Sequence, residues 1–397
     1  MALNFQQVRQ QVIEMGGKAP QRERHLHSLQ ATALKTLKSV AQDIDVLRSK
    51  VETVHSLNKY LRCAVPGDDP LDKIYACPSL PQNITVLAAD GSQINPDRHA
   101  SIDFSLINVG AIQMQIGSPD PPLTTVRSKL LYHEKIDSSS NYITEELVAL
   151  LRDLHERTLL AELAEDIELP IITLTDGPLE LWVGRDGVST PRSFQEHFEE
   201  YLNALRALQA VGASTAGYID KPRGDLLIRL LEIALLPDDQ LDQGGRDFRP
   251  FRGLTDTDLF TKILDSHQRS AVFAIQSRNA KKYEDSLALH FFYLNVGQDQ
   301  KHPAIVRVEI PAWVAYKPQM LDDLHAALIQ QSQVLGQRGY PYLLHRSHEV
   351  AVVSLDEKRQ VENMIALEFH KQGVSVGQES HKQSHKNASL QRGRYAG

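Results

Sequence analysis

Two stretches of similar pattern decide the fold: ITVLAADGSQ at residues 84–93 and IITLTDGPL at residues 171–179. In each, a run of apolar residues long enough for a buried strand stops at an Asp-Gly pair. Such a strand is expected to present its carboxylate, Asp90 or Asp176, at its own exposed end. Carboxylate oxygens on a rigid frame are the ligands that a hard divalent cation prefers. The pair of stretches therefore predicts a shared metal site, although a single Asp-Gly is equally well explained as turn chemistry.

Composition bounds the class of protein. The chain has 397 residues, 42% hydrophobic and 23% charged, which suits one large α/β domain with insertions or two average domains. A net charge of −7 argues against a protein that coats nucleic acid, but it is compatible with an enzyme that surrounds metals with carboxylates and grips phosphates through local basic patches. Cys63 and Cys77 form no C-x-x-C pair and are expected to be free thiols. The absence of a long apolar stretch or a leader pattern predicts a soluble, cytoplasmic protein.

The two ends of the chain differ from its middle. Residues 1–65 read as a polar helical segment whose apolar positions recur every three or four residues, as in a helix that packs on another helix of the same chain or of a second copy. Proline-rich residues 66–81 indicate a linker. Residues 371–397 are poor in apolar side chains and weakly basic, which predicts a disordered tail. The expected domain organisation is thus 1–65, 80–370 and 371–397.

The order of elements in the middle region predicts the fold class. Strand-like runs at residues 84–89, 101–112 and 129–136 would form an antiparallel meander. A helix over residues 144–166 then leads into the second Asp-Gly strand. Three antiparallel strands followed by a helical crossover to a parallel strand define a ribonuclease-H-like α/β layout with a mixed sheet and flanking helices.

Further candidates for the site come from three places. The crossover helix offers Glu156 and its rival Glu162, and helical periodicity alone makes either of them a solvated surface residue. The segment GYPYLLHRSH at residues 339–348 offers a tyrosine that could orient water or phosphate, and histidines that could bind metal or transfer protons near pH 7. Lys221 follows a predicted strand and is a candidate phosphate contact. The chain has no P-loop motif, so any ATP-driven motion would have to come from a partner.

Four motifs together resemble the NurA family of prokaryotic DNA-repair nucleases. They are ADGSQ at residues 89–93, TDGPL at 175–179, GYIDK at 217–221 and the segment 339–348, and the likeness covers about residues 80–370. The resemblance implies a ribonuclease-H-like fold, manganese-dependent 5′-to-3′ exonuclease and single-strand endonuclease activity, a homodimer, and partnership with a hexameric HerA-type ATPase. It implies metal-binding roles for Asp90 and Asp176, a helix glutamate at Glu156, and a late tyrosine and histidine at Tyr340 and His348, with His345 competing for the last position.

The resulting hypothesis is a DNA nuclease that uses manganese, or alternatively magnesium, in the processing of double-strand breaks. Asp90, Glu156, Asp176 and His348 would hold the metal, Tyr340 would assist catalysis, and Lys221 would contact a DNA phosphate. Two alternatives stay open: a catalytically inactive ribonuclease-H-like module that serves an ATPase as a dimeric scaffold or DNA clamp, and a metal-dependent phosphatase acting on small esters.

Overall fold

The computed structural model describes residues 3–97, 104–132, 143–168, 170–181, 192–244, 248–299, 301–336 and 339–374. The chain folds into two compact units that are interleaved in sequence. The first unit comprises residues 1–81, 177–182 and 216–341, and the second comprises residues 82–176, 183–215 and 342–397. The predicted division into residues 1–65, 80–370 and 371–397 follows sequence character and stays a prediction; the tail beyond residue 374 lies outside the described residues.

The second unit contains the strands that the sequence predicted, in the order β6-β3-β4-β5. Its strands are β3 (Thr85–Ile94), β4 (Phe104–Gln115), β5 (Leu123–Tyr132) and β6 (Ile171–Asp176). The pairs β3–β4 and β4–β5 are antiparallel, and β6 pairs with β3 in parallel. The helix α3 (Glu145–Ala164) connects β5 to β6, and the side chain of Thr144 caps its first turn by accepting a hydrogen bond from the Leu147 N–H. The ribonuclease-H-like layout is confirmed.

Two boundaries differ from expectation. β3 does not stop at Asp90 but continues to Ile94, because residues 90–94 pair with β4. Asp90 lies instead where the parallel neighbour β6 ends. The third strand starts at Leu123, six residues before the predicted start at Lys129. Its exposed, partly polar start was not recognised as strand because an edge strand needs no buried apolar face to pair.

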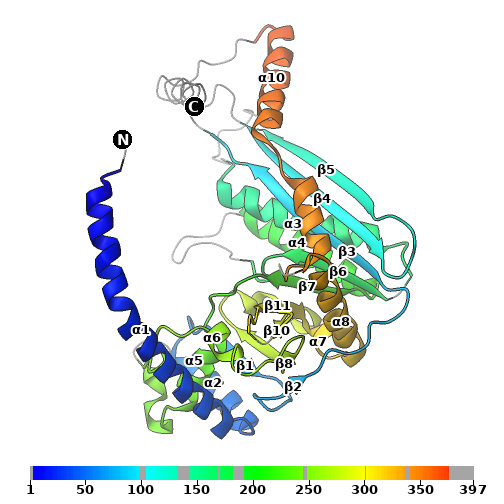
Figure 1. The fold of residues 1–397 in the computed structure, drawn as a ribbon. Helices are drawn as coiled ribbons and strands as arrows, with labels where there is room; N and C mark the ends of the chain where they lie inside the picture. Colours follow the sequence, from blue (N-terminus) through cyan, green and yellow to red (C-terminus); the bar gives the residue numbers. More distant parts are fainter. Residues whose placement is uncertain are drawn as a thin grey trace. The chain divides into compact units, whose positions relative to one another are not determined.

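The two faces of this sheet are covered by different helices. A Cβ built on Gly91 would meet Arg152 and Glu156 of α3, whereas a Cβ built on Gly110 would meet residues of α9 (Tyr342–Ala351). The helix α4 (Arg192–Ala210) packs on α3, and α10 (Leu355–Lys371) covers Phe104 and Leu106. Figure 1 shows α3 and α4 behind β3–β5 and the segment of α9 crossing in front. Each helix therefore has one face of the sheet to bury its apolar side chains against.

The strands of the first unit follow the order β1-β9-β10-β11-β7, with antiparallel neighbours. Its strands are β1 (Cys63–Pro66), β2 (Ile74–Tyr75), β7 (Ser214–Ile219, which begins in the second unit), β8 (Arg269–Ser270), β9 (Phe273–Gln276), β10 (Leu289–Asn295) and β11 (Ile305–Pro311). Its helices are α1 (Phe5–Ser39), α2 (Ile44–Leu57), α5 (Leu226–Ala234), α6 (Asp256–Phe260), α7 (Ala312–Ala315) and α8 (Pro318–Val334), with 3-10 turns at Asp238–Gln243, Ala280–Lys282 and Asp285–Leu287. The prediction of a linker at residues 66–81 is wrong in part, because β1 ends at Pro66 and β2 lies within this range.

The helix α1 is anchored at one end only. Its buried residues are Ala33, Thr36 and Leu37, all in its last two turns. Its first turns carry an exposed apolar stripe, listed here with exposed fractions: Phe5 65%, Val8 37%, Val12 52% and Met15 68%. Figure 1 shows this half of α1 extending away from the other helices of its unit.

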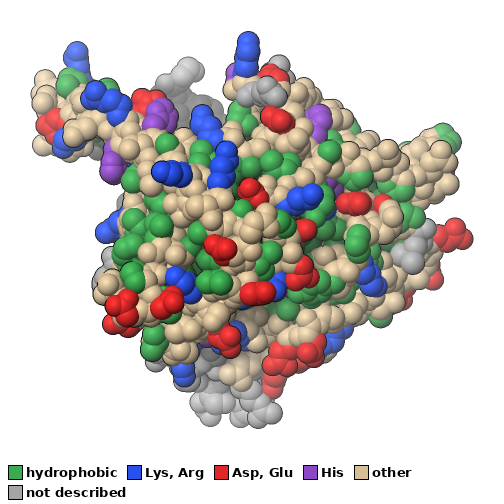
Figure 2. Space-filling view, turned by 90° about the horizontal axis from the view of Figure 1, so that it is seen from below, with side chains coloured by type: hydrophobic (Ala, Val, Ile, Leu, Met, Phe, Trp, Pro, Cys, Tyr) green, Lys and Arg blue, Asp and Glu red, His purple; other side chains and the backbone are tan. Residues whose placement is uncertain are grey.

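The surface seen from below bears mixed charge. In Figure 2 the described acidic and basic side chains of that face are interspersed with hydrophobic ones, with no wide area of a single sign. None of the described helices is both long enough and apolar enough to cross a membrane.

Candidate functional site in the second unit

Asp90 is held by its own strand and by α9. Its Oδ1 accepts a hydrogen bond from the Gly91 N–H at 2.8 Å, and its Oδ2 lies 2.6 Å from His348 Nδ1. The Asp90 side chain is 15% exposed and that of His348 is 61% exposed, so the pair lies at the surface with the carboxylate beneath the imidazole. The two residues are 258 positions apart in the chain, and only the packing of α9 on β3 joins them.

Asp176 stands beside Asp90 by strand register. The last parallel pair between β3 and β6 is Ala89 with Thr175, and the two aspartates are the next residues of their strands. Paired strands are about 4.8 Å apart, and residues in register point to the same face. The register therefore brings Asp90 and Asp176 to neighbouring positions of adjacent strands, with Asp176 exposed at the end of β6.

Glu156 approaches the same position from the opposite face of the sheet. It is 5% exposed, and a Cβ built on Gly91 would stand 2.7 Å from its Oε1. Burial raises the pKa of Glu156 well above its usual value, and the negative charges of Asp153 and Asp90 raise it further, against the lowering effect of Arg152. Helical periodicity alone favoured a solvated surface position, but Glu156 is buried, because glycine at position 91 lets α3 approach the strand closely. Its rival Glu162 is exposed and forms an ion pair with Arg127.

The carboxylates and the imidazole form an oxygen-rich set with surplus negative charge. Because Asp90 is paired with Gly110, it points toward α9 together with His348, while Glu156 lies on the α3 side of the same strand. Within the described ranges, no three His, Cys, Asp or Glu side chains converge closely enough to hold a metal ion. The donor types nevertheless fit Mg²⁺ or Mn²⁺, and a bound cation would offset the negative charges of Asp153 and Asp90, which add to the effect of burial on the pKa of Glu156.

The remaining predicted residues lie elsewhere. His345 Nε2 lies 3.6 Å from Glu349 Oε1, so His348 is the histidine of α9 that reaches Asp90. Tyr340 belongs to the first unit, where its ring packs edge-on against Tyr218 with a centroid distance of 5.5 Å. Lys221 also belongs to the first unit; it is exposed directly after β7 with a φ of 47°.

Sequence reasoning missed the residues that organise this site. Arg152 donates to Asp153 Oδ1 from Nη2 at 2.7 Å, and its Nε lies 3.6 Å from Glu156 Oε1. The spacing of Arg152 and Glu156, four residues apart on a predicted helix, was a usable signal. Ser92 lies in the ADGSQ motif, but no sequence signal pointed to its role or to Asn108. The two side chains donate to the Ala351 carbonyl at 2.5 and 2.8 Å and so fix the end of α9 that carries His348.

With three antiparallel strands, a crossover helix and a parallel fourth strand, the second unit has the ribonuclease-H-like α/β fold. A family model, the NurA domain, matches residues 84–353. This chain belongs to the NurA family.

One solved structure supports the fold. The NurA nuclease from Sulfolobus solfataricus is 12% identical, with a TM-score of 0.50, and the match covers 84% of this chain and 95% of that one. The catalytic domain of human endonuclease V is 10% identical, covering 81% and 98%, and LC9-RNase H1 is 13% identical, covering 35% and 64%. Their TM-scores of 0.32 and 0.23 are too low to support a conclusion. No curated protein sequence matches the chain.

Proposed function

We propose that this chain is a metal-dependent DNA nuclease that hydrolyses phosphodiester bonds with Mn²⁺ or Mg²⁺. The observation that supports the proposal is the register of β3 and β6, which brings Asp90 and Asp176 to neighbouring strand positions, together with the contact between Asp90 and His348. A structural turn would have no need of a second strand-end acid and an imidazole at the same point. Membership of the NurA family, and the nuclease name of the Sulfolobus protein, support the same chemistry.

Asp90, Asp176 and His348 would hold the metal on the α9 side, and Glu156 would add a carboxylate from the α3 side of the strand. A bound divalent ion would supply an activated water and stabilisation of the leaving oxygen. The Gly91 N–H fixes the orientation of the Asp90 carboxylate. If His348 Nδ1–H donates to Asp90, the neutral ring keeps its lone pair on Nε2, which can either bind the metal or accept a proton.

The polarity and substrate of the proposed cleavage are taken from the resemblance to the family. We propose 5′-to-3′ exonuclease and single-strand endonuclease action in the processing of double-strand breaks. Lys221, exposed and held at a positive φ after β7, would contact a DNA phosphate, and Tyr340 would act with the catalytic residues. A homodimer and a HerA-type hexameric ATPase are the proposed partners. The exposed apolar stripe of α1 supports a role of this helix in one of these contacts.

The nuclease assay uses DNA labelled at the 5′ or the 3′ end, with Mn²⁺, with Mg²⁺ or with chelator. The wild type should degrade it only with metal, and Asp90→Ala should lose this activity while keeping the circular dichroism of the wild type. The matched control is Asp120→Ala, which removes an exposed aspartate of the β4–β5 turn.

Cleavage by a folded Asp90→Ala protein, or undiminished cleavage with chelator, would contradict the proposal. DNA binding without cleavage by the wild type under any metal condition would favour the inactive scaffold or clamp. Faster release of phosphate from a small ester than cleavage of single-stranded DNA would favour the phosphatase.

The partner proposal is tested by light scattering of the wild type and of a Phe5→Ser/Val12→Ser variant, alone and with a HerA-type ATPase. Loss of the dimer or of the ATPase complex would assign α1 to that contact. If the variant still forms both the dimer and the ATPase complex, α1 takes part in neither contact.

A further inference from the structure

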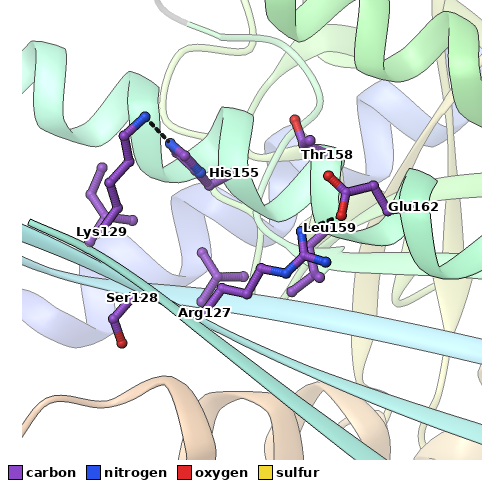
Figure 3. Close-up of a pocket in the computed structure, with 9 residues that line it drawn as sticks. Arg127, Ser128, Lys129, His155, Thr158, Leu159 and Glu162 are labelled. Atoms are coloured by element: carbon purple, nitrogen blue, oxygen red, sulfur yellow. Dashed lines mark hydrogen bonds and ion pairs between the residues drawn. The ribbon is translucent and has the colours of Figure 1, made fainter.

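A pocket lies in the second unit between α3 and the outer strands β4 and β5. Its volume is about 340 Å³, within the range of small-ligand sites. Its floor is formed by the buried side chains of Ile107, Val109 and Leu159. Arg127, Lys129, His155 and Glu162 surround this floor, and Figure 3 shows them pointing into the space between the strands and the helix.

The pocket belongs to the same sheet face as Glu156. Gly91 of β3 is in register with Val109 of β4, and Val109 is in register with Arg127 of β5. Residues of one register row point to the same face, so the row leads from the glycine beneath Glu156 across the pocket floor to Arg127. Two strand spacings amount to roughly 10 Å.

Among the described residues, the partners of the pocket's two cations are either exposed or neutral. Arg127 pairs with Glu162, and both side chains are about half exposed, at 53% and 43%. Lys129 Nζ lies 3.4 Å from His155 Nε2. Burial and the charge of Lys129 lower the pKa of His155, so the neutral imidazole can accept a hydrogen bond and leave the ammonium its other donors. Exposed ion pairs are weak, and a phosphate can replace the carboxylate of Glu162.

An apolar floor beside two cations matches the two parts of a nucleotide. A base or sugar can cover Ile107, Val109 and Leu159, while its phosphate reaches Arg127 and Lys129. A duplex would present stacked base pairs and offer no free base to such a floor, whereas the bases of a single strand are free to turn into it. The pocket lies beside β5, the edge strand of its sheet, whose residues Arg127 and Lys129 are exposed.

We propose that this pocket, the β5–α3 groove, binds one nucleotide of single-stranded DNA, with its phosphate held by Arg127 and Lys129. The inference rests on the proposed function, because it assigns a DNA-binding subsite to the same unit as the candidate catalytic residues. It adds a determinant of substrate affinity that does not take part in the chemical step.

The experiment measures binding of a fluorescent 12-nucleotide single strand by anisotropy, in chelator so that no cleavage occurs, as a function of salt. The variant is Arg127→Ala/Lys129→Ala. The matched control is Arg206→Ala/Lys358→Ala, which removes two surface cations of α4 and α10 that also pair with carboxylates. The groove variant should bind at least tenfold more weakly at low salt. Its slope of log K against log salt should fall by about 0.7, because the two cations together neutralise one phosphate, and each neutralised phosphate of a single strand contributes about 0.7.

Glu162→Gln tests the groove in the opposite direction. It removes the carboxylate that competes with phosphate for Arg127, so binding should tighten severalfold. Affinity and slope equal to the control in the double variant, or weaker binding by Glu162→Gln, would overturn the inference. The inference would also be overturned if dTMP or inorganic phosphate bound in the groove but did not displace the oligonucleotide.

The outcome is separable from that of the proposed function. An Asp90→Asn protein should bind the oligonucleotide like the wild type and not cleave it. In the metal-loaded protein the groove variant should raise KM about tenfold with kcat within twofold. If the groove variant binds DNA more weakly as expected but the wild type does not cleave DNA, the proposed nuclease function is wrong and the groove assignment stands. If the wild type cleaves DNA but the groove variant binds like the control, only the groove assignment is wrong.

Discussion

The carboxylate of Glu156 lies directly over Gly91, the residue that follows Asp90 in β3. This contact brings a buried acid of α3 to the strand that carries the candidate metal ligand. It is possible only because Gly91 has no side chain, since a Cβ there would stand 2.6 Å from Arg152 Cγ and 2.7 Å from Glu156 Oε1. The glycine of the Asp-Gly pair is therefore required by the packing of α3, independently of any turn.

Replacing Gly91 by alanine should destabilise the second unit. The added methyl group must push α3 away or force its side chains from their rotamers, which typically costs about 1–3 kcal/mol. The measurement is urea unfolding. The control is Gly16→Ala in α1, where a Cβ would meet nothing within 4 Å, and where alanine should leave stability unchanged or higher. Equal stability of Gly91→Ala and wild type would contradict the close approach of Glu156.

Replacing Glu156 by glutamine should weaken Mn²⁺ binding, because it removes a carboxylate from the proposed site. We expect a loss of about 10–100-fold, the scale found for groups that support a metal site. Titration calorimetry with Mn²⁺ in the absence of DNA gives the measurement. Glu162→Gln, six residues along the same helix and exposed, should change Mn²⁺ binding less than twofold. A larger loss for Glu162→Gln would assign the helix ligand to Glu162.

The two histidines of α9 should differ in their effect on cleavage. His348→Ala removes the imidazole beside Asp90 and should slow cleavage by about 10²–10⁴-fold, the usual contribution of a positioned acid–base group. His345→Ala removes a ring that pairs with Glu349 and should have little effect. Single-turnover cleavage of labelled DNA distinguishes them. Comparable losses in both variants would show that the contact with Asp90 does not select the functional histidine.

Asp256 in the first unit should make stability depend on pH. Burial raises its pKa to about 6, although hydrogen bonds from Tyr293 and from the N–H groups of Ile228 and Leu227 oppose the rise. A carboxyl whose folded pKa exceeds its unfolded value contributes stability that is complete below about pH 4 and lost as the pH rises through 6. The loss is on the order of 3 kcal/mol for a shift of about two units.

Asp256→Asn cannot ionise, so its stability should lack this fall. The excess stability of the wild type over Asp256→Asn, measured by urea unfolding, should shrink between pH 4 and pH 7. Asp239→Asn, an exposed control, should follow the wild type at every pH. A difference between wild type and Asp256→Asn that stays constant with pH would contradict the raised pKa. If Asp256→Asn does not fold, the test is the fall in the stability of the wild type itself between pH 4 and pH 7, which Asp239→Asn should reproduce.

The sequence by itself determined the elements of the second unit and their order. The apolar runs before Asp90 and Asp176 are long enough to be buried strands, and the helical periodicity of residues 144–166 fixes the crossover between them. From this order the parallel pairing of β3 and β6 follows, because a helical crossover returns the chain in the same direction. Hence the adjacency of the two aspartates could be predicted.

Only the tertiary structure decided what surrounds these aspartates. The burial of Glu156 depends on the missing side chain of Gly91, and the choice of His348 over His345 depends on how α9 is held by Ser92 and Asn108. Periodicity cannot supply either fact, because each depends on contacts between residues far apart in the chain. The interleaving of two compact units was hidden for the same reason: segments that are consecutive in sequence bury their apolar faces in different cores.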